Sequence, residues 1–477
     1  MKKIEKLILI GGALALASSA YAQEIDSFDS FGDFDSFGDG ESSSKLEVNG
    51  DASVELRAYV DADSAESVEM EATPSASLEL GYSGSKSDVK LSIDVDEETI
   101  KNHPEDVIDE LVLRGYFGNF TLEAGKMKLV WGKGDKLHVL DNFNADDYTD
   151  FIIPDYLDRR ISTPMLRGVY SLPFANMNLE AVYTPFLPVD RFSTSGRWTP
   201  AQVTSLTSTV TSSARQEVAD AFSRYTSASA TAGTLNALYA EYKAMESAYA
   251  ASLASATDLA IAKGAYDAAC TESGFDVDTI QTELTEAGSL YMLYLTNASS
   301  LSSDSSVIYP DLDNLKYGQF GGRMTWTMGQ VDLGLSYYNG WYKQPSVNAS
   351  KVDSFNTSYL TSGSVSEDEK FLAYDKKQTF GLEASSIIWH FNVRGEFAYN
   401  LTDDVDGSDP WVHNNSLAWL GGFDIDLPFW NANLNVQETG TYVLQGDKCD
   451  QNTLDVDYAK NGYSNNKIVC NLTTSFM

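Results

Sequence analysis

Between Lys45 and Val60 the chain alternates apolar and polar residues without a break. Side chains of an extended strand point to opposite faces with period two, so this stretch has one apolar face and one charged face. It is longer than the roughly 5 to 6 residues of an ordinary globular strand, and it suits the roughly 9 to 11 residues of a tilted membrane-spanning strand. A strand with one lipid-compatible face and one charged face is typical of a transmembrane β-barrel around water.

Segments with the same alternation recur along the chain and predict an all-β fold, a transmembrane antiparallel β-barrel of about 14 strands. The predicted strands lie near 45–61, 74–83, 87–96, 107–117, 119–130, 164–173, 176–186, 315–328, 330–341, 378–388, 390–401, 414–427, 430–445 and 465–476. Connections after even-numbered strands are short, whereas those after odd-numbered strands are long, polar and acidic. Outer-membrane barrels have short periplasmic turns and long external loops, so this alternation predicts that the long connections lie outside the cell.

The first 22 residues predict an export signal, because lysines precede an apolar run that ends in a small-residue site near Ala22. Residues 23–44 form an acidic segment with regularly spaced Phe that cannot bury a core, and we interpret it as a disordered periplasmic tail. The tail acts either as a spacer or as a binding segment for a periplasmic partner. Because the tail is predicted to lie in the periplasm, we expect the protein to lie in an outer membrane of the Gram-negative type.

Charge and composition exclude several classes of function. A net charge of -36 is too acidic for binding nucleic acid. It fits either a cation-attracting vestibule or solvated loops and the tail. After the signal there is no run of about 18 apolar residues, so only a closed barrel remains as a spanning structure. Three widely separated cysteines give no metal or disulfide pattern.

The barrel prediction is interrupted by one helical segment. Residues 200–306 are rich in Ala, Ser and Thr, and their apolar residues recur at helical spacing. We predict an α-helical extracellular insertion here, with helices near 200–228, 230–268 and 276–297. The predicted domains are therefore a first part of the barrel at 45–199, the insertion at 200–306 in an external loop, and a second part of the barrel at 307–477.

Residues 131–163 form a long polar connection in which the alternation stops. At the mouth of a barrel such a segment most economically folds back into the lumen, where its carboxylates pair with inward Arg side chains. Its ion pairs either fix the fold of the loop or form a constriction that selects solutes. The candidate pore residues in this loop and on the polar strand faces are Asp135, Asp141, Asp147, Asp150, Asp158, Arg159, Arg160, Arg167, Arg114, Arg323, Arg394 and Glu396.

The pattern in this connection resembles a segment of porin-like outer-membrane β-barrel proteins of largely unassigned function. It is carried by Trp131-Gly132, Asp135, Asp141, Asn144, Asp147, Asp150-Phe151, Pro154, Asp158-Arg159-Arg160 and Pro164. The resemblance implies an outer-membrane barrel with an inward loop and supplies no substrate. The helical insertion and the acidic tail depart from a plain porin.

Catalytic patterns are weak, so we predict no enzyme, no cofactor and no metal. The four histidines, His103, His138, His390 and His413, fall in turns, loops or strand edges, and we interpret them as surface or interfacial residues. The prediction is a porin-like channel for small hydrophilic solutes that favours cations, with outer-membrane lipid and the barrel assembly machinery as partners. Two alternatives stay open: a surface adhesin anchored by the barrel, and a transporter of hydrophobic compounds, against which the charged inner faces argue.

Overall fold

The structure is a computed structural model that describes residues 45–59, 69–135, 137–150, 159–193, 196, 198–303, 305–427, 432–445, 448 and 467–474. The predicted export signal, the acidic tail and Asp158 lie outside the described residues. The chain divides into two compact units. One comprises residues 1–192, 312–344 and 374–477, and the other comprises 193–311 and 345–373.

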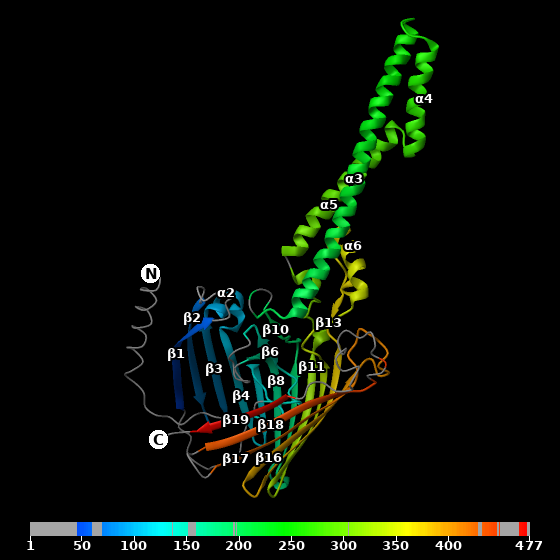
Figure 1. Cartoon of the computed structure of the whole chain (residues 1–477). Helices are drawn as coiled ribbons and strands as arrows, with labels where there is room; N and C mark the ends of the chain where they lie inside the picture. Colours follow the sequence, from blue (N-terminus) through cyan, green and yellow to red (C-terminus); the bar gives the residue numbers. More distant parts are fainter. Residues whose placement is uncertain are drawn as a thin grey trace. The chain divides into compact units, whose positions relative to one another are not determined.

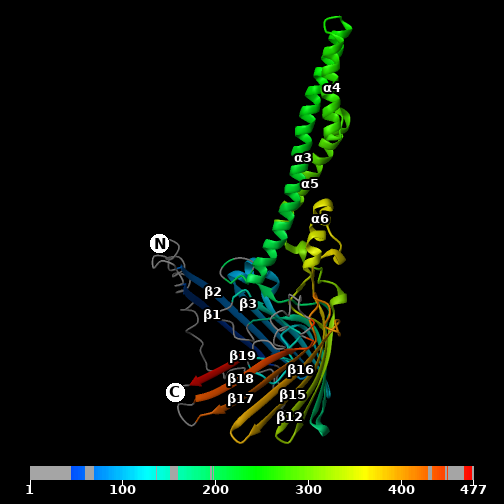
Figure 2. The same cartoon turned by 45° about the vertical axis from the view of Figure 1, so that its right-hand side comes forward.

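The first unit is built on one large antiparallel sheet, as the alternation predicts, and this sheet curves strongly (Figures 1 and 2). Its 14 strands follow one another in chain order, and each predicted strand range overlaps one of them. They are β1 (Lys45–Tyr59), β2 (Glu69–Ser83), β3 (Ser87–Asp96), β4 (Ile108–Phe117), β5 (Phe120–Met127), β8 (Thr163–Leu172), β9 (Met177–Thr184), β11 (Gln319–Met328), β12 (Val331–Trp341), β15 (Lys376–Ile388), β16 (Phe391–Thr402), β17 (Ser416–Asp426), β18 (Ala432–Val443) and β19 (Lys467–Thr474). Within the described residues the ladders run from β1 to β19, and no ladder joins these two outer strands.

Short and long connections alternate along this sheet. Tight turns use backbone conformations with positive φ, at Gly118 (66°) before β5, Gly329 (65°) before β12 and Asn176 (48°) before β9. Glycine and asparagine tolerate this conformation best, which explains their place in these turns. Trp389, with φ 58°, is the bulky exception in the turn before β16.

The longer connections of the first unit carry small elements. They are α2 (Glu97–Asn102) and a three-stranded sheet of β10 (Arg191–Phe192), β6 (Ala145–Tyr148) and β7 (Arg160–Ile161). Short 3-10 helices lie at Pro104–Asp106, Pro173–Ala175 and Leu315–Tyr317.

The two faces of the large sheet differ in the way the alternation requires. We call the face that carries the connection 128–162 the inner face. On β4 the inner-facing Val112 is 8% exposed, while its neighbour Leu113 on the outer face is 54% exposed. On β8 Met165 is buried and Leu166 is exposed. The apolar side chains of the outer face are therefore accessible, although a water-soluble sheet would bury them.

The second unit is helical. It contains α3 (Ala201–Ala250), α4 (Ala256–Ser273), α5 (Val277–Ser303), α6 (Val352–Ser362), a two-stranded sheet of β13 (Ser346–Val347) and β14 (Leu372–Ala373), and 3-10 helices at Ser305–Ile308, Ala349–Lys351 and Glu367–Glu369. The expected break near residue 229 is wrong, because α3 continues through it. That stretch consists of Ala, Ser and Thr with neither Pro nor Gly, so nothing in it stops a helix.

Helices of the second unit pack through small residues and aromatic rings. Ala228, Ala232 and Leu235 of α3 are buried against Ile280 and Ala287 of α5. The segment 345–373, which the alternation treats as a loop, supplies α6, whose Phe355 is fully buried against α3 residues. Among the described residues no helix has an apolar stretch long enough to cross a membrane.

Candidate functional site: the inner connection and its charges

The inner connection, residues 128–162 between β5 and β8, is anchored to the inner face by aromatic packing. Trp131 and Phe143 are each 1% exposed and meet edge to face with ring centroids 5.0 Å apart. Phe143 contacts Tyr338 of β12 in the same way at 5.2 Å. The Trp131 indole also donates from Nε1 to Glu180 Oε1 of β9 at 3.1 Å. The connection therefore has a core of its own on the sheet.

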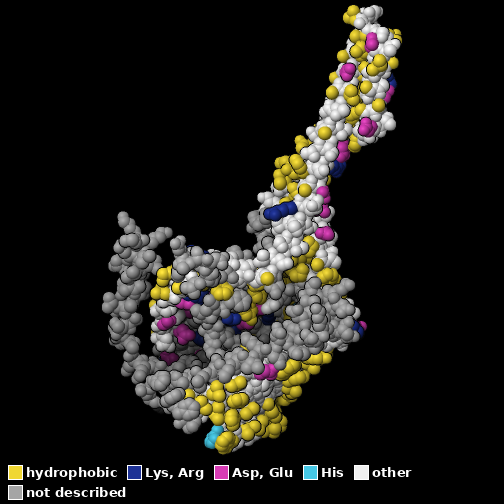
Figure 3. Space-filling model, viewed as in Figure 1, with side chains coloured by type: hydrophobic (Ala, Val, Ile, Leu, Met, Phe, Trp, Pro, Cys, Tyr) yellow, Lys and Arg dark blue, Asp and Glu magenta, His cyan; other side chains and the backbone are white. Residues whose placement is uncertain are grey.

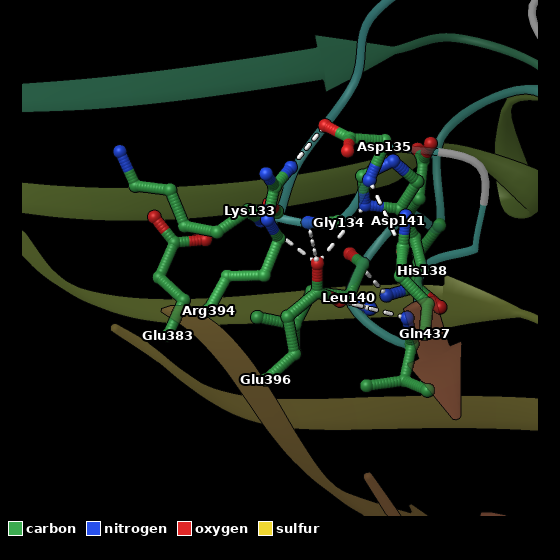
Figure 4. A network of polar contacts seen from close by, with 12 residues as sticks. Lys133, Gly134, Asp135, His138, Leu140, Asp141, Glu383, Arg394, Glu396 and Gln437 are labelled. Atoms are coloured by element: carbon green, nitrogen blue, oxygen red, sulfur yellow. Dashed lines mark hydrogen bonds and ion pairs between the residues drawn. The ribbon is translucent and has the colours of Figure 1, made fainter. Parts of the chain in front are cut away.

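Glu396 of β16 holds the other flank of this connection (Figure 4). Its Oε1 accepts the backbone N–H groups of Lys133 at 2.7 Å and Gly134 at 2.8 Å. Its Oε2 accepts those of Val139 at 2.8 Å and Leu140 at 3.3 Å. Gly132 permits the approach, since a Cβ there would lie 2.3 Å from Glu396 Oε1 and its φ is +120°.

His138 completes the set of groups around the Glu396 carboxylate, which we call the cradle. The interpretation of His138 from sequence as a surface or interfacial residue is wrong. Its side chain is 3% exposed, and Nδ1 lies 3.0 Å from Glu396 Oε1. The loop places the ring there because Glu396 already fixes the backbone on both sides of it. Sequence offered no signal for this, since the partner lies 258 residues away.

A row of alternating arginine and glutamate side chains follows neighbouring strands on the inner face, and we call it the charge ladder. Arg114 Nε of β4 lies 2.5 Å from Glu123 Oε1 of β5, and Arg167 of β8 lies 2.8 Å from both Glu123 and Glu180 of β9. The ladder continues through Arg323 of β11, which is 4.0 Å from Glu180 and 2.5 Å from Glu383 of β15. From β4 to β11 each charge faces an opposite charge on the next strand, which is the arrangement that stabilises neighbouring strands.

Between β11 and β15 the ladder crosses β12, where Gly334 lies directly opposite Glu383. A Cβ at Gly334 would lie 2.3 Å from Glu383 Oε1. The absence of a side chain therefore lets Glu383 reach across β12 to Arg323.

The structure places the sequence-predicted pore residues in two groups, and Asp158 lies outside the described residues. Arg114, Arg167 and Arg323 belong to the charge ladder. The others lie on or beside the inner connection: Arg394 contacts Asp135 and Asp424, Asp141 contacts Arg160, Asp150 contacts Arg57 of β1, Asp147 lies 3.7 Å from Arg191, Arg159 lies 5.5 Å from the Tyr148 ring centroid, and Glu396 forms the cradle. These acidic residues of the connection thus each have a basic partner.

The sequence did not predict a cluster of charged residues that lies where the inner connection meets the ends of β11, β12 and β15. Asp190 Oδ1 accepts the backbone N–H of Asp146 at 3.0 Å. Burial, reinforced by the neighbouring Asp190, raises the pKa of Asp146 to about 6. Lys343 and Lys377 lie at the same end of the sheet, and burial holds the pKa of Lys343 well below its usual range. Only the register brings these residues together, so the sequence carried no signal for the group.

One cluster consists of residue types that commonly bind metal ions. His103, Glu105 and Asp106 bring ligand atoms within 4.8 Å of one another. Asp106, however, already pairs with Lys126 at 2.8 Å and Arg191 at 2.5 Å. Two cations at one carboxylate favour an ion-pair cluster over a metal site.

Acidic side chains also gather on the inner face of β1 to β3. Asp51 of β1 and Glu79 of β2 are exposed, and Asp94 of β3 is half-buried. Figure 3 shows acidic side chains over these strands on the hollowed face. This part of the inner face is acidic, in contrast to the paired charges of the ladder.

No family model matches the chain, and no curated protein matches it in sequence. Solved structures that resemble it include OmpF of Salmonella typhi in complex with daunomycin, with 8% identity, a TM-score of 0.36, and coverage of 91% of this chain and 87% of that chain. The outer membrane channel DcaP of Acinetobacter baumannii has 9% identity, a TM-score of 0.33, and coverage of 88% and 84%. OprB of Pseudomonas putida has 10% identity, a TM-score of 0.33, and coverage of 90% and 84%. Such TM-scores are too low to transfer a function, and they amount to a distant structural resemblance to outer-membrane porins and channels.

Proposed function

We propose that the large sheet closes into a β-barrel between β1 and β19 in an outer membrane and forms a channel for small hydrophilic solutes. The export signal predicted before Gln23 would bring the chain there, and outer-membrane lipid would cover the outer face. Closure removes two unpaired strand edges. These edges are costly in lipid, because each unsatisfied backbone N–H or C=O group there costs several kcal/mol, as other unsatisfied buried polar groups do.

The distribution of side chains between the two faces carries this proposal. The outer face exposes large apolar side chains on strand after strand, such as Leu113 of β4, Leu166 of β8 and Leu382 of β15. The inner face carries the charge ladder, and Glu123 and Glu383 there are only 4% exposed. Apolar groups outside and charged groups inside suit a spanning barrel with a polar interior.

Cation preference is the selectivity that the acidic side chains on the inner face of β1 to β3 support. Among the candidate pore residues, Asp141, Asp147 and Asp150 each have a basic partner, which gives them a role in holding the inner connection. We therefore assign selectivity to the exposed acidic face of β1 to β3, where Asp51 and Glu79 meet solvent. The acidic side chains attract cations over about a Debye length, roughly 10 Å at 0.1 M salt, so the cation preference should grow at low salt.

Planar-bilayer recording of the purified full chain tests both the channel function and its cation preference. We expect discrete conductance steps and, in a KCl gradient, a reversal potential of the sign for cations. The double variant Asp51→Asn with Glu79→Gln should weaken that preference. The matched control removes two carboxylates from α2, Glu97→Gln with Glu98→Gln, and should leave it unchanged.

Two outcomes oppose the proposal at different points. Absence of conductance from protein that is folded and inserted would exclude a channel. Anion preference, or equal effects of the two double variants, would leave the channel but remove the acidic face of β1 to β3 as its selective element.

Orientation is a separate part of the proposal. The long connections would lie outside the cell and the acidic tail in the periplasm. Protease added to intact cells should cleave within residues 200–300 or 343–377 and should spare residues 24–41. Labelling of the tail on intact cells would reverse the orientation.

A further inference from the structure

Two lysines converge at one end of the sheet on the inner face. Lys377 is the second residue of β15, and Lys343 follows β12 by two residues. Tyr338 of β12, which is 1% exposed, lies near both of them. Nζ of Lys343 lies 5.9 Å and Nζ of Lys377 lies 5.8 Å from the centroid of its ring. Both ammonium groups therefore share one buried aromatic side chain.

Few acceptors serve these two ammonium groups. Lys343 Nζ donates to Gln319 Oε1 at 2.5 Å. The Gln319 amide cannot turn away, because its Nε2 donates to Thr184 Oγ1 and to the Phe186 carbonyl, each at 3.0 Å. Among the described residues Lys377 Nζ makes neither a hydrogen bond nor an ion pair, and its contacts are the rings of Tyr338 and, at 4.9 Å, Tyr342.

The carboxylate that acts on both lysines is already engaged. Asp190 accepts the Asp146 N–H and, at 3.0 Å, the Gln344 side-chain amide. Burial and the like charge of Lys377 both disfavour the charged form of Lys343, and this holds its pKa well below the usual range. An anion between the ammonium groups would relieve the repulsion and supply the missing acceptors.

We propose that Lys343 and Lys377, with Gln319 and Tyr338 positioning them, form a binding subsite for a small oxyanion, the carboxylate or phosphate group of a solute. The arginines of the charge ladder are unsuited to this role, because Glu123, Glu180 and Glu383 already occupy them. The subsite goes beyond a cation-favouring channel. It binds its ligand whether or not the protein conducts ions.

Isothermal titration calorimetry of the full chain in detergent tests the subsite with inorganic phosphate and, separately, with succinate. We expect saturable binding of at least one probe and a loss of affinity of at least tenfold in Lys377→Met. Lys376→Met is the matched control, since Lys376 is the adjacent residue on the opposite face of the same strand, 5.5 Å from the Trp341 ring centroid. This variant should bind like the wild type.

Amine-reactive labelling of the wild type, quantified by mass spectrometry, covers the case in which Lys377→Met does not fold. Phosphate or succinate should protect Lys343 and Lys377 severalfold while Lys376 stays reactive. Protection by one probe alone would assign the subsite to that anion. Failure of both probes to bind or protect, or equal effects at Lys376 and Lys377, would overturn the proposal, and conductance recorded in parallel would show whether the channel function survives it.

Discussion

Asp146 is a carboxyl group held beside a second carboxyl group in the inner connection. Tyr148 donates its hydroxyl to Asp146 at 3.1 Å, but burial and Asp190 dominate and raise the pKa of Asp146 from 3.8 to about 6. A raised pKa means that the folded state binds the proton more tightly than the unfolded state does. The stabilising contribution of this group is therefore complete below about pH 4 and is lost as the pH rises through about 6.

The variant Asp146→Asn should consequently stabilise the protein at pH 7.5 and have little effect at pH 4. A shift of this size corresponds to at most about 3 kcal/mol, and partial solvation reduces it to about 1 to 2 kcal/mol. Urea unfolding at the two pH values measures the difference. Asp147→Asn is the control of opposite sign, because Asp147 accepts from Thr149 and lies near Arg191. Stabilisation of both variants at pH 7.5 would contradict the assignment.

Glu396 should be the residue on which the placement of the inner connection depends most. Glu396→Ala leaves the N–H groups of Lys133, Gly134, Val139 and Leu140 without their acceptor, and each unsatisfied buried donor costs about 1 to 3 kcal/mol. We expect limited proteolysis to cut within 128–162 at least tenfold faster, with the strands intact. Glu438→Ala, which removes a carboxylate bonded to Trp419 at 3.2 Å, should not accelerate these cuts.

At the scale of elements, strands could be predicted from sequence because period two is a local property. The helix boundaries were harder to predict from the sequence. The α3 helix ends at Ala250 and α4 begins after Ser255, whose hydroxyl and the Asp258 carboxylate form a capping box. Ser and Asp at this spacing are the signal that would have moved the predicted break from 229 to this point.

The candidate site was predictable only in its residue types. Carboxylates and arginines on the polar strand faces could be identified, but their partners depend on register. Arg323 meets Glu383 across β12 only because Gly334 leaves room. The cradle around Glu396 and the lysine pair at Tyr338 join segments that are distant in the chain, and no local pattern encodes such contacts.

The charge ladder yields an element-scale prediction. Gly334→Ala places a Cβ 2.3 Å from Glu383 Oε1 and must displace that carboxylate from Arg323. Overpacking of this kind costs about 1 to 3 kcal/mol, which urea unfolding resolves. Gly421→Ala in β17 is the matched strand control, because a Cβ there meets nothing within 4 Å. Equal destabilisation by the two variants would show that the ladder does not depend on Gly334.

At the scale of the whole sheet, the two outer strands β1 and β19 decide whether the fold is a barrel. An even number of antiparallel strands makes the first and last antiparallel to each other, so their edges are compatible for pairing. Side-chain alternation then fixes which residues can meet. Cys470 of β19 lies opposite Val436, and Val436 is on the face opposite to that of the buried, inward Gln437. In a closed barrel Cys470 therefore shares a face with the outer-face residues of β1.

A cysteine scan along β1 tests closure through this parity. In a background with Cys270→Ser and Cys449→Ser, single cysteines at positions 46 to 56 are oxidised in the membrane, and the faster gel migration of the looped chain is measured. Facing residues of antiparallel strands lie about 4.5 to 5.5 Å apart, within disulfide range, while a shift of one residue turns the side chain to the other face. Crosslinks should therefore form only at one or two neighbouring even positions among Leu46, Val48, Gly50, Ala52, Val54 and Leu56. Crosslinks at odd positions would refute this register, whereas dimers in place of loops would mean that the β1 edge pairs with a second copy of the chain.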